Sequence, residues 1–344
     1  MKKTLLATAI VGALGASAAA QAATVYDQDG TRLDVYGRIA MGIEGGGPEF
    51  DSQDREIDNG AEFVDVFSRL GLRMSQQVTS DLSAFGHLEW RFRADERRSG
   101  EAFRETRQSY IGLKSEQYGT VVGGNFDSFY NQFVSKPFDV YINEDIIEFA
   151  DYSKQSSGDS IGYYTPELDG FTAFVQAKHY STRGQLEPTA GSETAFQGGV
   201  RYAQGPFTVG LGFVDDVARA GSDSNDEMLY GLMGSYDITD QFTARLGYEG
   251  RENNEVLGGG YDTFGIGGTF TTGPWAFNVD YYNIERDDDT TSNAWAAGGY
   301  YKVSSAFDVF VEVADGDAPN VNRDTSLGDL TDNVYWLTGA RYHF

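Results

Sequence analysis

The sequence predicts an all-β protein, a transmembrane antiparallel up-and-down β-barrel of about sixteen strands. Three observations carry this prediction. Apolar and polar residues alternate with a period of two over most of the chain, short turns alternate with long loops, and the last residue is an aromatic, Phe344. Alternation of this kind is typical of strands with two unlike faces. Serial hairpins with unequal ends and an even number of strands are typical of barrels that span a membrane.

The alternation is clearest in the segment 84–93. Its even positions are apolar, and the residues between them include His87, Glu89, Arg91 and Arg93. The same pattern recurs in 33–43, 64–75, 207–213, 242–248, 275–282, 307–313 and 334–344. The segments 102–114 and 292–303 have an ambiguous phase, so the strand count is open by two.

The two faces of these strands indicate what each of them meets. The polar faces carry charged residues at mid-strand, whereas the apolar faces carry aromatic residues near strand ends. A barrel with a polar lumen and a lipid-facing apolar band fits this distribution. In 64–75 it places Val64, Val66 and Leu70 on the lipid side, and Arg69 on the lumen side. A soluble β-sandwich also explains the alternation, but it does not explain so many hairpins in series.

The connections between strands come in two alternating lengths. Short turns are expected at 77–81, 166–170, 203–206, 237–240, 271–274 and 304–305. Long loops rich in Gly and Asp are expected at 45–62, 94–101, 182–194, 215–227, 251–260, 284–292 and 314–332. This arrangement predicts a meander whose two ends differ in loop length.

The first two dozen residues differ from the rest. Lys2 and Lys3 precede an apolar stretch, Leu5–Ala13, and small residues follow as far as Ala22. A basic start, a short apolar stretch and an Ala-x-Ala ending predict a secretory signal peptide, residues 1–22, that is cleaved to leave a barrel domain of 23–344. A membrane anchor is disfavoured because the apolar run is shorter than the roughly 20 residues that span a bilayer.

Composition excludes several other functions. The formal net charge is −26, so binding to nucleic acid through its phosphates is not expected. The chain has no Cys and its three His residues are far apart, so we expect neither a zinc site nor a cofactor. His87 and Glu89 share a polar face and could suggest acid–base catalysis, but polar residues of a lumen are the preferred interpretation. Calcium binding by the acidic runs at 223–227 and 287–289 stays open.

Several motifs in order resemble one family. Thr106–Lys114 with Tyr118, Gly119 and Gly123 closely resembles the hairpin between the fourth and fifth strands of Gram-negative general porins. The family's first three strands resemble Asp34–Arg38, Ser68–Leu72 and Gly86–Trp90, and its last strand resembles Gly339–Phe344. Each motif alone is weak evidence for the family, whereas the order and spacing of all the motifs together are specific to it.

This resemblance implies a function and a set of partners. The expected protein is an outer-membrane homotrimer through which ions and small hydrophilic solutes diffuse passively, without catalysis. Its expected partners are outer-membrane lipid and lipopolysaccharide, and the assembly machinery that recognises the terminal Phe344.

The resemblance also implies a constriction in the pore. The family's third long loop folds into the lumen, and here it should follow a strand near Thr120–Asn125, which points to 126–158. Arg38, Arg69 and Arg107 stand at the family's basic wall positions, and Arg73, Arg91 and Arg93 share the lumen-facing parity of their strands. The acids that would oppose these residues are Asp139, Glu144, Asp145 and Glu148, and Glu148-Phe149 resembles the Glu-Phe of the family's loop motif.

One departure from the family bears on ion selectivity. Where many members have a further Arg before the sixth strand, this chain has Lys154. Together with the acidic total, this predicts a preference for cations, because acidic side chains bias a pore toward cations. Two alternatives stay open. One is a sugar-selective pore with Tyr130, Phe133 and Tyr141 as an aromatic track, and the other is an adhesin or structural barrel.

Overall fold

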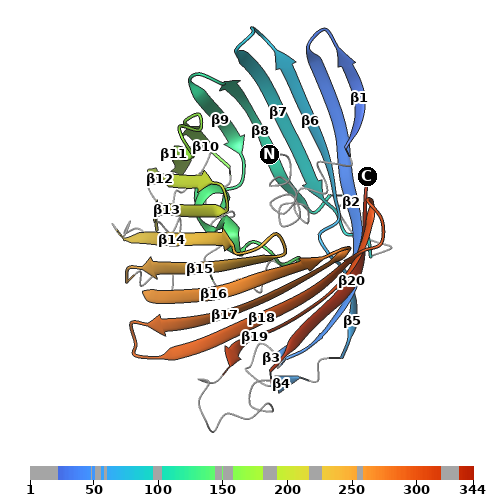
Figure 1. Cartoon of the computed structure of the whole chain (residues 1–344), viewed down its shortest axis with the longest axis vertical. Helices are drawn as coiled ribbons and strands as arrows, with labels where there is room; N and C mark the ends of the chain where they lie inside the picture. Colours follow the sequence, from blue (N-terminus) through green and yellow to red (C-terminus); the bar gives the residue numbers. More distant parts are fainter. Residues whose placement is uncertain are drawn as a thin grey trace.

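The computed structural model describes residues 22–47, 49–50, 56–57, 60–95, 103–143, 149, 158–180, 192–216, 227–253, 259–318 and 333–344. Its strands form a closed antiparallel barrel (Figure 1). The elements are β1 Ala23–Gln28, β2 Thr31–Gly46, β3 Glu49–Phe50, β4 Glu56–Ile57, β5 Glu62–Asp65, β6 Arg69–Gln77, β7 Leu82–Arg91, β8 Glu105–Ser115, β9 Gly119–Asn125, η1 Asn131–Ser135, η2 Lys136–Phe138, β10 Ser160–Tyr164, β11 Phe171–Tyr180, β12 Glu193–Gln204, β13 Phe207–Asp215, β14 Met228–Asp237, β15 Phe242–Arg251, β16 Tyr261–Thr272, β17 Trp275–Arg286, β18 Thr291–Lys302, β19 Phe307–Ala318 and β20 Tyr335–His343. No helix in these ranges has the length and apolar character needed to cross a bilayer.

The barrel has sixteen strand positions, as the sequence predicts. The main sheet contains 18 strands, but β5 and β6 both pair with β2 and are two parts of one barrel strand. Similarly, β20 pairs with the residues of β2 from Arg38 onward, and β1 pairs with the beginning of β2. Because β1 and β20 pair with successive parts of the same edge of β2, they occupy one strand position together and close the ring there.

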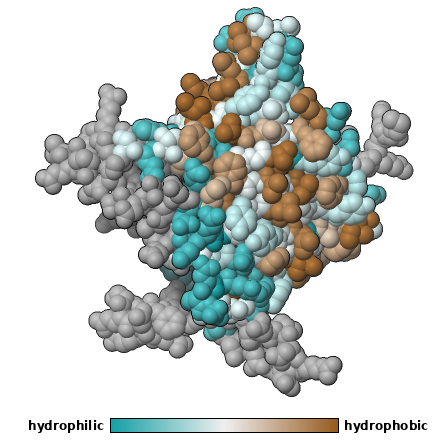
Figure 2. All heavy atoms as spheres, turned by 90° about the vertical axis from the view of Figure 1, so that its left-hand side faces the viewer, coloured by the Kyte–Doolittle hydropathy of each residue, from teal (hydrophilic) through white to brown (hydrophobic). Residues whose placement is uncertain are grey.

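Outward and inward residues alternate as the sequence predicts along most strands. Ile39, Leu211 and Val279 are exposed on the outside, whereas Tyr36 and Asp280 are buried inside. Figure 2 shows the outward apolar residues as a broad brown band over one face of the molecule. An exposed apolar band of this extent is typical of a surface that contacts lipid.

The prediction for the beginning of 64–75 is wrong. Val66 is only 2 % exposed, and Val64 packs with it against Ala40 inside the barrel. The cause is a break between β5 and β6, where Phe67 takes a φ of 59°. A non-glycine residue in this left-handed region interrupts the pleat. The interruption reverses which positions face the lumen on its two sides.

The turns also differ from the prediction at one place. The expected long loop at 284–292 is a tight hairpin, because β17 continues to Arg286 and β18 begins at Thr291. Asp289 takes a φ of 64° there, a conformation that Asp tolerates in turns. The short turns expected at the other end of the barrel are present, for example between β12 and β13.

The segment after β9 lies inside the ring of strands (Figure 1). It begins at Phe126, contains η1 and η2, and its described part runs to Asn143, with Phe149 beyond. Its buried aromatic and aliphatic residues share one hydrophobic cluster with wall residues of β9, β11, β13, β14, β17 and β18. We call residues 126–143 and 149 the inward loop.

Candidate functional site

One level of the inner wall carries a row of basic residues across four neighbouring strands. Arg91 on β7 pairs with Arg69 on β6, Arg69 with Arg38 on β2, and Arg38 with His343 on β20. Since paired residues of an antiparallel sheet lie side by side, these side chains share one height in the lumen. Arg38 is 7 % exposed and donates from Nε to the carbonyl of Phe67 at 2.9 Å.

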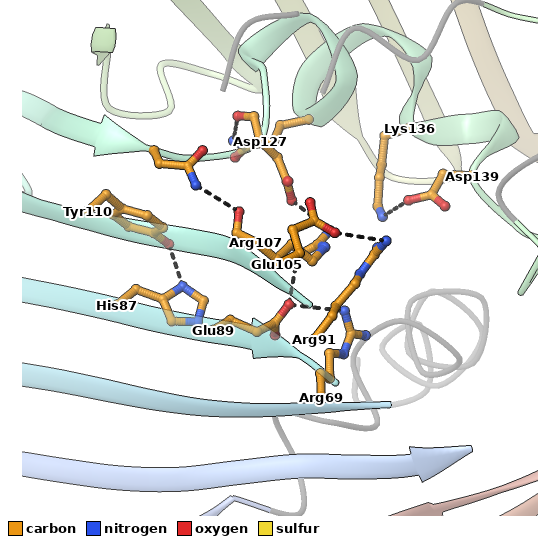
Figure 3. A network of polar contacts seen from close by, with 12 residues as sticks. Arg69, His87, Glu89, Arg91, Glu105, Arg107, Tyr110, Asp127, Lys136 and Asp139 are labelled. Atoms are coloured by element: carbon orange, nitrogen blue, oxygen red, sulfur yellow. Dashed lines mark hydrogen bonds and ion pairs between the residues drawn. The ribbon is translucent and has the colours of Figure 1, made fainter. Parts of the chain in front are cut away.

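Glu89 on β7 stands at the centre of this basic wall. Its Oε1 accepts from Arg69 Nη1 at 3.3 Å and from Arg107 Nη1 at 2.9 Å, and its Oε2 accepts from the Tyr36 hydroxyl at 2.7 Å. Figure 3 shows Arg69 and Arg107 converging on this carboxylate from two strands. One buried acid therefore neutralises part of the charge of two arginines.

Two further acids contact arginines of this wall, Glu105 from β8 itself and Asp127 from the segment after β9. Arg107 Nη2 donates to Asp127 Oδ2 at 3.1 Å, and Arg91 lies 3.7 Å from Glu105. Burial raises the pKa of Asp127, and the nearby Arg107 guanidinium opposes this shift. Arg38, Arg69, Arg91 and Arg107, with Glu89 and Glu105, form what we call the arginine cluster; Asp127 belongs to the inward loop and contacts the cluster through Arg107.

The structure brings together four of the six predicted basic residues. Arg73 lies beside the cluster, with its guanidinium 4.3 Å from the centre of the Tyr36 ring. Arg93 follows the end of β7 and is exposed, so it is not part of the row. The difference arises because the strand ends at Arg91, and the parity of a strand no longer applies beyond its end.

The predicted acids are only partly described. Asp139 lies on the inward loop and pairs with Lys136, and Figure 3 shows both side chains reaching from the loop toward the arginine cluster. Glu144, Asp145, Glu148 and the remaining residues of the predicted 126–158 segment that the structure leaves out lie outside the described residues.

Sequence reasoning missed the roles of Asp127 and Glu105, and it considered Glu89 as a polar lumen residue beside His87 rather than as the partner of Arg69 and Arg107. The polar parity of 84–93 does point Glu89 to the lumen. Its partners follow from the pairing of β6, β7 and β8, which brings together residues about 20 positions apart.

His87 takes part in a hydrogen-bonded group of aromatic hydroxyls. Its Nδ1 is 2.8 Å from the Tyr110 hydroxyl, and its Nε2 contacts the Tyr36 hydroxyl. Both ring nitrogens are therefore occupied by tyrosines, an arrangement that orients the ring within the wall. Among the described residues, no group of three or more His, Asp or Glu side chains has a metal-binding arrangement.

Hydrogen bonds from the wall hold the inward loop at both ends. Near its start, the backbone N–H of Phe129 donates to Gln176 at 3.0 Å, and the Tyr130 hydroxyl donates to Glu249 at 2.7 Å. Near Asn143, the backbone N–H groups of Ile142 and Asn143 donate to the two oxygens of Glu312, at 2.6 and 2.8 Å. Buried donors and acceptors satisfied in this way hold a loop in a single position.

These contacts contradict the aromatic track considered from the sequence. Tyr130 and Tyr141 are buried, and Phe133 stacks on Phe174 of β11 with ring centres 5.0 Å apart. Packing against the wall, rather than contact with solutes, occupies these rings.

Comparison with known proteins gives a consistent result. Residues 7–320 match a family model described as Gram-negative porin. A monosaccharide porin of a Halomonas species is 27% identical, with 91% of this chain and 94% of that protein covered. Outer membrane porin N of Escherichia coli strain K12 is 26% identical, with 72% of this chain and 66% of that protein covered.

Solved structures share the fold. Salmonella typhi OmpF in complex with daunomycin superposes with a TM-score of 0.67 at 16% identity, covering 94% of this chain and 100% of that one. An anion-selective porin from Comamonas acidovorans gives a TM-score of 0.71 at 19% identity, covering 91% of this chain and 100% of that one. These two similarities establish the architecture and do not decide which ions pass.

Proposed function

Because the chain belongs to the Gram-negative porin family, whose members are outer-membrane channels for small solutes, we propose that its narrowest passage lies between the arginine cluster and the inward loop. One observation carries this proposal: a loop held by buried hydrogen bonds lies inside the barrel, and charged side chains of both signs meet in the lumen beside it. Opposed charges across confined water create a transverse field that favours polar solutes over apolar ones.

We further propose that the pore leans toward cations. Three acids, Glu89, Glu105 and Asp127, contact arginines of the cluster, so most of the positive charge of these four arginines is balanced. Loss of the signal peptide would remove Lys2 and Lys3 and change the formal net charge from −26 to −28. The net negative charge of the chain would produce a negative potential in the pore, which would raise the local concentration of cations there.

A planar bilayer experiment tests both statements. Purified protein under a KCl gradient should give ohmic current steps and a reversal potential of the sign for K⁺ preference. A reversal potential of the sign for Cl⁻ would contradict the cation preference, and an absence of current steps would contradict the channel itself.

A second candidate concerns the solute. The similarity to a Halomonas monosaccharide porin over most of both chains favours passage of small sugars. Since Tyr130 and Tyr141 are buried, a sugar would meet the polar wall and not their rings. Liposome swelling with a series of monosaccharides and disaccharides measures the rate at which each sugar passes through the pore. Rates that fall steeply with solute size support free diffusion, whereas saturation by one sugar indicates a binding site.

We also propose that residues 1–22 are a cleaved signal peptide and that the barrel assembles as a homotrimer. Ala23 pairs with Val35, and Phe344 exchanges two backbone hydrogen bonds with Gly37. Cleavage before Ala23 would therefore leave intact the pairing of β1 and of the C-terminal residues with β2. A structural neighbour from Vibrio cholerae is described as a trimer form. N-terminal sequencing of the mature protein and gel migration with and without heating test these two proposals.

A further inference from the structure

Several inner-wall residues of strands β13 to β16 that lie against the inward loop are glycines. Five glycines have this position, and we call them the glycine seat: Gly210, Gly212, Gly231, Gly247 and Gly265. They form two adjoining rows of the sheet. Gly247 pairs with Gly265 in one row, and Gly212 pairs with Gly231 in the other.

The loop fills the space above these glycines. A Cβ atom at Gly231 would lie 2.0 Å from the hydroxyl oxygen of Tyr130, and one at Gly210 would lie 2.2 Å from the carbonyl oxygen of Phe133. Non-bonded heavy atoms are most stable at about 3.5–4.0 Å. A single methyl group at Gly210 would therefore require the loop backbone to move away from the wall, and one at Gly231 would require the Tyr130 side chain to move.

Gly247 and Gly265, which pair with each other, have the same property. A Cβ atom at Gly247 would lie 2.8 Å from both Phe138 and Phe149, and one at Gly265 would lie 2.7 Å from Phe149. Two large buried side chains flank these glycines: Tyr282 packs against both rings, and Met233 belongs to the same hydrophobic cluster. The glycines therefore lie between larger side chains, and aromatic rings of the loop fill the space that glycine leaves open.

Glycine weakens a strand because it has no side chain to pack and loses much conformational freedom. Five glycines under one loop are consequently unfavourable for the strands themselves. What they permit is close approach of another part of the chain, here Tyr130, Val134, Phe138 and Phe149.

We propose that the glycine seat sets the width of the pore, an inference that rests on the proposed function. The seat lies on β13 to β16, and the arginine cluster lies halfway round the ring on β2 and β6 to β8. Because the loop settles into the seat, it lies farther from the arginine cluster than a wall with side chains would allow. The five glycines are positioning residues for the constriction.

Single-channel conductance of three alanine variants tests this proposal. Gly231→Ala places its Cβ 2.0 Å from a Tyr130 hydroxyl that donates to Glu249, whereas Gly212→Ala places it at the longer distances of 2.8 Å from a methyl group of Val134 and 3.0 Å from the carbonyl oxygen of Gly198. Gly299→Ala is the matched control, since its Cβ would meet nothing closer than 3.6 Å. We expect a clear loss of conductance for Gly231→Ala, a smaller loss for Gly212→Ala, and the wild-type conductance for Gly299→Ala.

A double variant separates displacement of the loop from general damage. Tyr130→Phe removes the oxygen that the new Cβ would meet, so it should restore part of the conductance lost in Gly231→Ala. Heat-modified gel migration checks that each barrel has formed, and if Gly231→Ala forms none, the comparison of Gly212→Ala with Gly299→Ala decides. Unchanged or higher conductance in the variants would overturn the proposal. Absence of conductance in the wild type would instead overturn the proposed function.

Discussion

Glu89→Gln should shift the selectivity of the pore toward anions. The carboxylate of Glu89 accepts from Arg107 at 2.9 Å and from Arg69 at 3.3 Å, so its charge is central to the arginine cluster. Glutamine keeps the shape of the side chain and can still accept from the Tyr36 hydroxyl, which is 2.7 Å away. The substitution therefore removes one negative charge with little change in packing.

The size of the effect follows from Coulomb's law. One unit charge acts on an ion about 7 Å away in water with about 0.6 kcal/mol. A cation loses this free energy and an anion gains it, so their difference changes by about 1.2 kcal/mol. Salt at 0.1 M has a Debye length of about 10 Å and leaves roughly half of this. The cation-to-anion permeability ratio should then fall about threefold.

The reversal potential under a KCl gradient measures this ratio. Glu116→Gln is the matched control, because Glu116 lies in the turn after β8, away from the cluster, and its side chain is 78% exposed and pairs with Lys114. If Glu89→Gln leaves the reversal potential where Glu116→Gln leaves it, the arginine cluster does not face the ion path.

Three other perturbations follow from the same contacts. Glu312→Ala removes the acceptor of two loop N–H groups, and each hydrogen bond to a charged group is worth about 1.5–3 kcal/mol. The loop should therefore fluctuate, and the noise of the open-channel current should rise. Noise equal to that of the wild type would contradict the role of Glu312 in holding the loop. Since burial raises the pKa of Asp127, acidification should remove its negative charge at a higher pH than that of an exposed carboxylate, and the cation preference of the pore should fall with it. Asp127→Asn should lack this fall in cation preference. If the pH dependence of selectivity is the same in Asp127→Asn and the wild type, Asp127 does not act on the ion path. Phe344→Ala should lower the yield of heat-modifiable barrel in the outer membrane, and a wild-type yield would exclude an assembly role for this residue.

Alternation along the chain predicts the barrel and most of its lumen-facing residues, whereas the place of a loop inside the lumen is implied only by the resemblance to the porin family. It worked because each strand has one face to lipid and one to the lumen, so polarity reports orientation directly. It failed at Val64 and Val66, where the positive φ of Phe67 reverses the parity and no local pattern marks the reversal.

The partners within the site could not be predicted from the sequence. Ile142 meets Glu312 across 170 positions of the chain, and Tyr130 meets Glu249 across 119. Such contacts arise only when the ring closes and brings opposite strands to face the same lumen. The glycine seat has the same origin, because a glycine in a strand signals close approach without indicating what approaches.

The most direct test of the central claim uses a single introduced thiol, since the chain has no Cys of its own. Asp139→Cys places it on the inward loop, at a position 39% exposed, and Val279→Cys places a control on the outer face of β17. Both proteins are labelled in detergent with a bulky thiol reagent and then reconstituted for single-channel recording. If the passage lies between the loop and the arginine cluster, labelling of Asp139→Cys should sharply reduce conductance while Val279→Cys retains it. Equal conductance of the labelled and unlabelled Asp139→Cys channels would contradict that claim.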